Sequence, residues 1–262
     1  MKKSGLVLFS AALVGLALSA KAAPALVMEG DGSAVGDRTY LSGVYTSEDH
    51  GMTVCQLGIA DPLQIPSNSF VVRGLRWNLF YGSSFAMHGL DIGLSAFTRT
   101  EMSGVALQAA NWVEGDMTGL QIGLLGNVVG GTAIGAQFGG IISWNRGPVT
   151  GFEMAPVNLN GSFDGVQLGL LNMNKGAARA LELGIANINL SEFSGCSIGL
   201  LNCADTFAGA QFGLVNIVAR SGRGVQFGVF NAAESYEGLQ IGLLNVIGNA
   251  VIPVLPLVNG NF

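Results

Sequence analysis

Apolar and polar residues alternate in short stretches of this chain, and the alternation returns at a nearly constant interval. In residues 238–245, GLQIGLLN, the second, fourth and sixth residues are Leu239, Ile241 and Leu243, whereas the first, third and fifth are Gly, Gln and Gly. A period of two is typical of a β-strand with two different faces. Glycine is a poor helix former, so its fixed positions argue against a helix. Each stretch is therefore predicted to be a strand.

Similar stretches recur over most of the chain. GVQLGLLN begins at Gly165, GCSIGLLN at Gly195, GAQFGLVN at Gly209 and GVQFGVFN at Gly224. A fixed period of this kind indicates a repeat architecture. The steps between units are 14 to 16 residues, and the units begin at Gly74, Gly89, Gly104, Gly119, Gly135, Gly151, Gly165, Ala180, Gly195, Gly209, Gly224, Gly238 and Ile252.

The third position of the units is mostly polar. Polar side chains in one row indicate that the row is hydrated or mutually hydrogen-bonded. In a closed sheet the row would line the lumen, where its charged members would form either a constriction or a solvated or paired face. The predicted lumen row consists of Arg76, Asp91, Gln121, Gln137, Glu153, Gln167, Glu182, Gln211, Gln226 and Gln240.

Two architectures fit the period. In a parallel β-solenoid each unit is one coil, and the asparagines that end many units would stack as a ladder. Charged residues such as Lys175 and Glu234 lie in what would be the return leg of the coil, whereas in an antiparallel meander they are turn residues. We therefore predict an all-β, antiparallel up-and-down meander closed as a β-barrel of about 13 to 15 strands. The alternative is a β-solenoid of 15-residue coils.

A barrel of this size would be too wide for the side chains of its continuous apolar face to fill its interior. That face is therefore expected to point outward, with lipid as its partner. Strands of about ten residues with aromatic flanks are typical of outer-membrane barrels. Trp77, Trp112 and Trp144 suit either an interfacial belt or core packing. The short turns argue against a barrel, and so does an asparagine such as Asn245 on the apolar face.

The sequence divides into three segments. Residues 1–22 have the features of a secretory signal peptide: Lys2 and Lys3, an apolar run over residues 6–20, and an Ala-Lys-Ala cleavage site. Residues 23–73 are expected to contribute two or three strands, including residues 39–46 and 53–60. Residues 74–262 form the repeats, in one domain with the preceding strands. We expect an exported protein of the outer membrane or cell surface, with a periplasmic or secreted location as the alternative.

Composition limits the function further. The net charge is −5 and only 11% of residues are charged. No basic cluster is present, so nucleic acid is not expected as a partner. Cys196 and Cys203 would face opposite sides of one strand and could not form a disulfide with each other. His50 and His88 belong to no recognisable catalytic or zinc motif. No enzyme activity, cofactor or metal is predicted, and small solutes or surface partners remain alternative ligands to lipid.

The phrases GVQLGLLN, GAQFGLVN and GLQIGLLN resemble the tandem repeats of a Leptospira-type family of bacterial surface-repeat proteins. The resemblance covers residues 74–259, about 70% of the chain. It implies an exported surface or outer-membrane protein without an established activity, and it supplies no catalytic residues. Two functions follow as hypotheses: a membrane-embedded structural or pore-like protein, or an exported β-repeat protein that acts as a binding or adhesion module.

Overall fold

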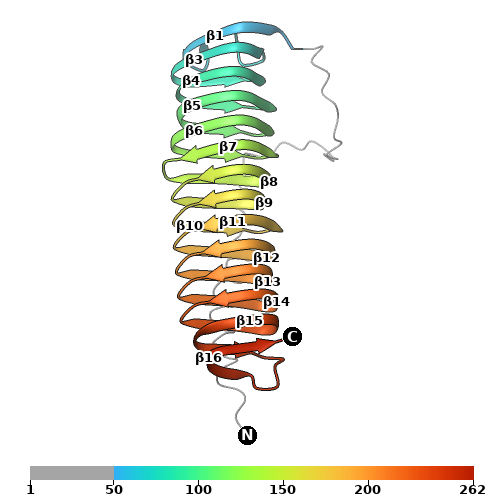
Figure 1. Cartoon of the computed structure of the whole chain (residues 1–262). Helices are drawn as coiled ribbons and strands as arrows, with labels where there is room; N and C mark the ends of the chain where they lie inside the picture. Colours follow the sequence, from blue (N-terminus) through green and yellow to red (C-terminus); the bar gives the residue numbers. More distant parts are fainter. Residues whose placement is uncertain (1–49) are drawn as a thin grey trace, which may run out of the picture. The chain divides into compact units, whose positions relative to one another are not determined.

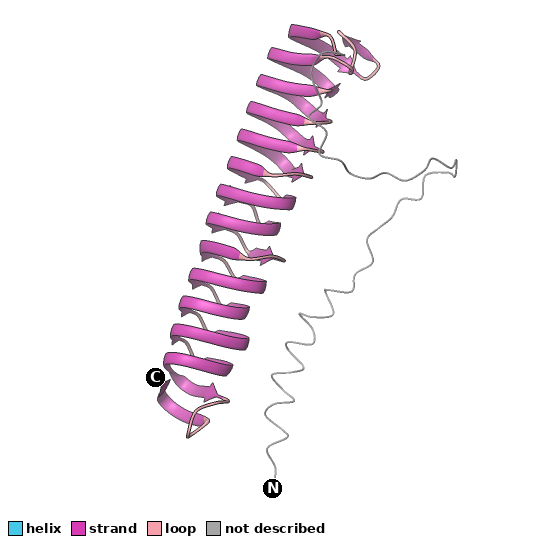
Figure 2. Cartoon of the chain, turned by 90° about the vertical axis from the view of Figure 1, so that its right-hand side faces the viewer, coloured by secondary structure: helices cyan, strands magenta, loops and turns pink. Residues whose placement is uncertain are grey.

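The computed structural model describes residues 50–262, which form a column of stacked β-coils with about 13 turns (Figure 1). No helix occurs in this part of the chain (Figure 2), and so no helix there is long and apolar enough to cross a membrane. The strands are β1 (Met52–Ala60), β2 (Leu63–Ile65), β3 (Val71–Ser84), β4 (Ala86–Thr98), β5 (Glu101–Val113), β6 (Asp116–Val129), β7 (Ala133–Gly139), β8 (Ile142–Met154), β9 (Val157–Leu168), β10 (Leu171–Asn174), β11 (Ala178–Leu183), β12 (Ala186–Ile198), β13 (Leu201–Phe212), β14 (Val215–Phe227), β15 (Phe230–Ile247) and β16 (Val254–Asn261).

Neighbouring coils pair in parallel, and equivalent residues of the repeat lie side by side. Gly224 pairs with Gly238, and Gln226 pairs with Gln240. The same parallel register continues from β3 to β15. The predicted antiparallel barrel is therefore wrong, and the alternative, a β-solenoid, is the observed fold. We number the positions of each coil from the unit starts given above, so that row 3 contains the third residue of every coil. Some coils have an extra residue at the bend, and beyond it each residue takes the row number of the residues with which it pairs.

The antiparallel prediction failed because coils such as that of β14 and β15 bend at rows 5 and 6. Strand β14 ends at Phe227, Gly228 and Val229 form the bend, and β15 begins at Phe230. Gln226 and Asn231 are five residues apart, so on one straight strand they would face opposite sides. Both are fully buried, because the bend shifts the alternation by one residue. This bend also places the repeated asparagine inside the coil.

The charges in the return leg are compatible with a coil because they point outward. Lys175, Glu192 and Glu234 are exposed. Inward positions of the same leg contain residues such as Asn174 and Phe193, which are buried. The return leg thus contributes to the core despite its charged residues.

The apolar core occupies the part of each coil that is distant from the bend. Met87, Met102 and Met117 form it in the first coils, and Phe163, Phe193, Phe207 and Tyr236 form it in the later ones. The rings of Phe193 and Phe207 are stacked with centroids 6.0 Å apart. The interior is therefore apolar at one end of the coil and, as shown below, polar at the other.

Both ends of the column are covered by strands that depart from the repeat. At the first coil, β1 adds parallel to β3, and β2 folds back antiparallel onto β1. Strand β1 coincides with the strand predicted at residues 53–60, whereas residues 39–46 and the predicted signal peptide lie outside the described residues. At the last coil, β16 pairs antiparallel with β15, so the unit placed at Ile252 does not add another parallel coil. Such caps occupy edges that would otherwise pair with another chain.

Candidate functional site

The residues predicted to line a lumen form row 3, and this row lies inside the solenoid. All ten are buried: Arg76, Asp91, Gln121, Gln137, Glu153, Gln167, Glu182, Gln211, Gln226 and Gln240. The amide of Gln137 donates to Gln121 at 3.1 Å, and the amides of Gln226 and Gln240 donate to Gln211 and Gln226, each at 2.7 Å. The row is thus packed and mutually hydrogen-bonded in the core of the coils.

An ion pair occupies row 3 in the first two full coils. Arg76 donates from Nε to Asp91 Oδ1 at 2.8 Å and from Nη2 to Asp91 Oδ2 at 2.5 Å. The guanidinium also donates to the hydroxyls of Ser84 and Thr98. A buried pair needs such additional partners to offset its desolvation. The hydrogen bonds of the Arg76–Asp91 pair indicate that it has a structural role in this part of the core.

Two carboxyl groups occupy row 3 in the middle coils. Glu153 accepts hydrogen bonds from Asn145 at 2.9 Å, Asn160 at 2.6 Å and Gln167 at 3.0 Å. Burial raises the pKa of Glu153 to about 7, and these hydrogen bonds oppose the rise. The effect follows from the cost of keeping a charge away from water.

Glu182 has the same environment two coils further along. It accepts hydrogen bonds from Asn174 at 2.7 Å and Asn189 at 2.9 Å, and burial raises its pKa to about 7. Each of the two coils therefore contains a carboxyl group that changes charge near neutral pH.

Row 8 is a ladder of asparagines inside the bend. The amide of Asn172 donates to Asn187 Oδ1 at 2.8 Å and to the backbone oxygen of Leu183, in row 4, at 3.1 Å. The same pair of bonds recurs along the column, so each side chain links two coils and satisfies a carbonyl at the bend. The fully buried members are Asn127, Asn158, Asn172, Asn187, Asn202, Asn216, Asn231 and Asn245.

The outward rows that surround the bend are apolar. Rows 2 and 4 lie on one side of the bend, row 6 lies at it, and rows 7 and 9 lie on the other side. No Asp, Glu, Lys, Arg or His occupies these rows in any coil from residue 74 to residue 247. We call this surface the apolar band. Its members in row 6, the most exposed row, include Leu79, Leu94, Leu124, Leu170, Ile185, Leu200, Leu214, Val229 and Leu243.

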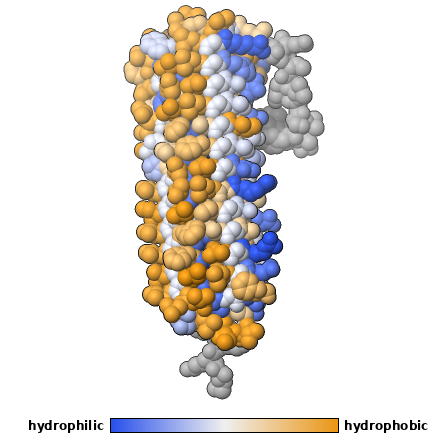
Figure 3. Space-filling model, viewed as in Figure 1, coloured by the Kyte–Doolittle hydropathy of each residue, from blue (hydrophilic) through white to orange (hydrophobic). Residues whose placement is uncertain are grey.

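The apolar band runs along the whole column, and Figure 3 shows one side of it as a continuous hydrophobic surface. Trp77, Trp112 and Trp144 all belong to it and are 48%, 48% and 39% exposed, so they do not pack in the core. An exposed apolar surface of this length far exceeds what monomeric soluble proteins usually show. It is therefore the strongest candidate for an interaction surface in the described residues.

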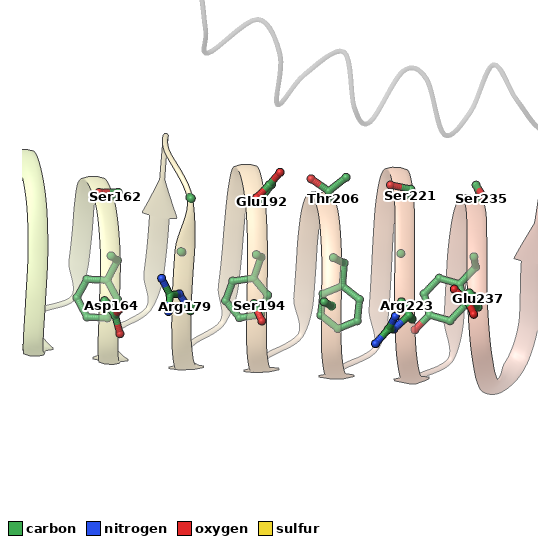
Figure 4. A pocket seen from close by; sticks show the side chains of 18 of the residues that line it. Ser162, Asp164, Arg179, Glu192, Ser194, Thr206, Ser221, Arg223, Ser235 and Glu237 are labelled. Atoms are coloured by element: carbon green, nitrogen blue, oxygen red, sulfur yellow. The ribbon is translucent and has the colours of Figure 1, made fainter.

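Charged side chains are concentrated on the opposite side of the coil, beside a groove of about 1050 Å³. Along one wall lie Ser162, Glu192, Thr206, Ser221 and Ser235, and along the other lie Asp164, Arg179, Ser194, Arg223 and Glu237 (Figure 4). Acidic and basic groups are interspersed, so the groove shows no preference for one sign of charge. We call it the polar groove.

Two of the three cysteines are poorly suited to react as nucleophiles. Cys55, Cys196 and Cys203 are free. Burial raises the pKa of the Cys203 thiol to about 11 and also raises that of Cys196. A thiol of this kind stays protonated at neutral pH and is a poor nucleophile. Among residues 50–262, no group of three or more His, Cys, Asp or Glu side chains is arranged to hold a metal ion.

Comparison of this chain with family models, with curated proteins and with solved structures finds no match. The candidate surfaces therefore rest on the geometry alone. The sequence predicts the apolar rows as a lipid-facing surface, but its pattern does not separate the polar groove from ordinary turns. The available signal is the Ser and charged residues directly before and after core aromatics such as Phe163, Phe193 and Tyr236.

Proposed function

We propose that this protein is an exported β-solenoid that acts as a structural or binding module at the cell surface, and that it attaches to its partner through the apolar band. The observation that carries this proposal is the absence of charge from five adjacent outward rows. Burial of apolar surface is the main favourable term in most protein association, so a partner that covers the band gains most of its free energy there.

The arrangement of the core supports the same proposal. Asparagine and glutamine ladders fill the interior beside the bend, where apolar side chains would ordinarily lie. Leu200 and Leu214 are 54% and 52% exposed, although their inward neighbours Asn202 and Asn216 are fully buried. Leu200 and Leu214 thus contribute little to the core. Their presence is explained by contact with a partner.

The cellular location is supported by sequence features. The apolar run and small-residue cleavage site in residues 1–22 favour export. The resemblance of the repeats to Leptospira-type surface-repeat proteins favours the outer membrane or cell surface. Both features agree with a binding or scaffolding role, which needs no catalytic residues.

The proposal is tested by separating cells that express the protein into envelope and soluble fractions. We expect the wild-type protein in the envelope and the L200K/L214K variant mainly in the soluble fraction, because two charges then interrupt the apolar band. The matched control is S194K/A208K, which adds the same charges at exposed positions beside the polar groove, each directly before the first glycine of the coil that contains Leu200 or Leu214. Unchanged envelope attachment of L200K/L214K would refute the proposal. Release of the control alone would assign attachment to the polar groove.

A further inference from the structure

We infer that the partner of the apolar band is a lipid leaflet, into which the bend of every coil inserts while the column lies parallel to the membrane plane. This inference rests on the proposed function, since it names the partner that the band would contact. It places the charged side of the column in water.

The first argument is the shape of the band. In the coil that begins at Gly209, Phe212 faces one side, Leu214 lies at the bend and Val215 faces the other side. A second copy of this chain, packed face to face, would cover one side and leave the other exposed. A fluid hydrocarbon phase surrounds an apolar edge from both sides, so it matches the band better.

The second argument is depth. Rows 2 to 6 are four residue steps apart, which corresponds to about 13 Å at about 3.3 Å per residue in a strand. One leaflet contributes about half of the roughly 30 Å hydrocarbon thickness of a bilayer. The apolar rows therefore match one leaflet, and the column would lie in one side of the membrane without spanning it.

The third argument is the pairing of the backbone at the bend. An unpaired peptide group in hydrocarbon costs several kcal/mol, so structures that enter lipid must satisfy their own hydrogen bonds. Gly199 N donates to Phe212 O at 2.9 Å, and the amides of Leu200 and Leu201 both donate to Ile185 O, at 2.9 and 3.0 Å. The same pattern recurs at the neighbouring bends. The bend thus enters lipid with these backbone groups paired to adjacent coils.

The distribution of charge predicts the type of membrane contact. The band contains no charged residue, and acidic and basic residues are interspersed on the opposite side. Attraction to anionic headgroups is therefore not the driving force, and binding should depend little on salt or on anionic lipid. This distinguishes the inferred contact from a basic surface that adheres electrostatically.

The test is flotation of the purified full chain with phosphatidylcholine vesicles, with and without phosphatidylglycerol, at low and high sodium chloride. We expect the wild-type protein to float with both vesicle types, with a partition coefficient that changes less than about threefold with salt. L200K/L214K should reduce the coefficient by about tenfold or more, because lysine is costly in hydrocarbon. S194K/A208K should change it by less than about twofold, and it retains the same N-terminal residues as the other variant.

Tryptophan fluorescence supplies a second readout. The three tryptophans of the chain all lie in the band. Lipids brominated on their acyl chains should quench this fluorescence in the wild-type protein, and quenching by bromines near the headgroup should be similar to or stronger than quenching by deeper ones. Circular dichroism of each variant, with a thermal midpoint close to that of the wild type, establishes that the lysines have not unfolded the column.

Several results would overturn the inference. Flotation only with anionic vesicles at low salt would indicate electrostatic binding. A lipid-free dimer in which acrylamide no longer quenches the tryptophans would assign the band to a second copy. Absence of flotation, together with envelope attachment that still requires Leu200 and Leu214, would refute the lipid leaflet and leave the proposed function intact. Absence of flotation, together with envelope attachment that does not require Leu200 and Leu214, would refute both the lipid leaflet and the proposed function.

Discussion

Side-chain amides and carboxyl groups occupy equivalent positions in row 3, but only the carboxyl groups change charge with pH. Glu153 and Glu182 accept hydrogen bonds from several amides, and these bonds do not offset the cost of burying a negative charge. Their pKa is raised from 4.5 to about 7, so the folded state binds these protons more tightly than the unfolded chain does. Their stabilising contribution is complete below pH 4.5 and is lost as the pH rises through about 7.

E153Q/E182Q should therefore be more stable than the wild-type protein at pH 8 and nearly equal to it at pH 4.5. Each carboxylate costs up to about 3 kcal/mol at high pH, since one pKa unit corresponds to about 1.4 kcal/mol. Urea denaturation between pH 4.5 and pH 8 measures the difference. The control is E237Q, which removes an exposed carboxyl group. An unchanged slope of stability against pH in the double variant would contradict the assignment.

At the scale of one coil, the bend that follows β13 combines a glycine in row 5, Gly213, with asparagines in row 8, Asn202 and Asn216. A Cβ atom on Gly213 would lie 2.5 Å from the backbone oxygen of Gly199 and 2.7 Å from Asn202 Nδ2. Asn202 Nδ2 cannot move away without loss of its hydrogen bonds to Asn216 Oδ1 and to the backbone oxygen of Phe212. The glycine thus allows the asparagine ladder to pack directly against the backbone of the bend.

G213A should destabilise the column by about 2 kcal/mol or more, because the new methyl group separates two coils. The control is G260A, where the nearest atom, at 3.0 Å, belongs to the exposed ring of Phe262. Thermal unfolding followed by circular dichroism compares the two. Equal midpoints would show that the bend tolerates a larger residue and that the asparagine ladder does not depend on glycine.

At the scale of the whole molecule, the last parallel coil would present an unpaired strand edge to other chains if nothing covered it. Strand β16 pairs with β15 in the opposite direction and ends the parallel register. A β-edge without such a cap is a template for another chain. The two caps thus favour a column of defined length over a fibre.

Deletion of residues 251–262 should convert the protein into concentration-dependent oligomers joined end to end. Size-exclusion chromatography with light scattering measures their mass. The control is F262S, which keeps β16 and replaces only the exposed terminal ring. A deletion variant of unchanged mass across a wide concentration range would show that β16 does not prevent edge pairing.

Much of the fold was encoded locally. The period of two within each unit, the 14-to-16-residue repeat and the rows of glycine, glutamine and asparagine were all determined by the sequence. So were the exposed apolar rows, because alternation places every second side chain on one face. These features identified an all-β repeat protein with an unusually apolar outer surface.

The direction of the strands and the position of row 8 were decided only by the tertiary structure. Each strand has a neighbour one repeat before it and another one repeat after it. The local sequence of a strand is the same whether it pairs with these neighbours in parallel or antiparallel. The rule of alternation holds within a straight strand, and the bend at Gly228 and Val229 interrupts it. Asn231 therefore moved from the predicted apolar face to the core, where its hydrogen bonds join the coils. Residues that would have lined a barrel lumen became the packed interior of a solenoid for the same reason.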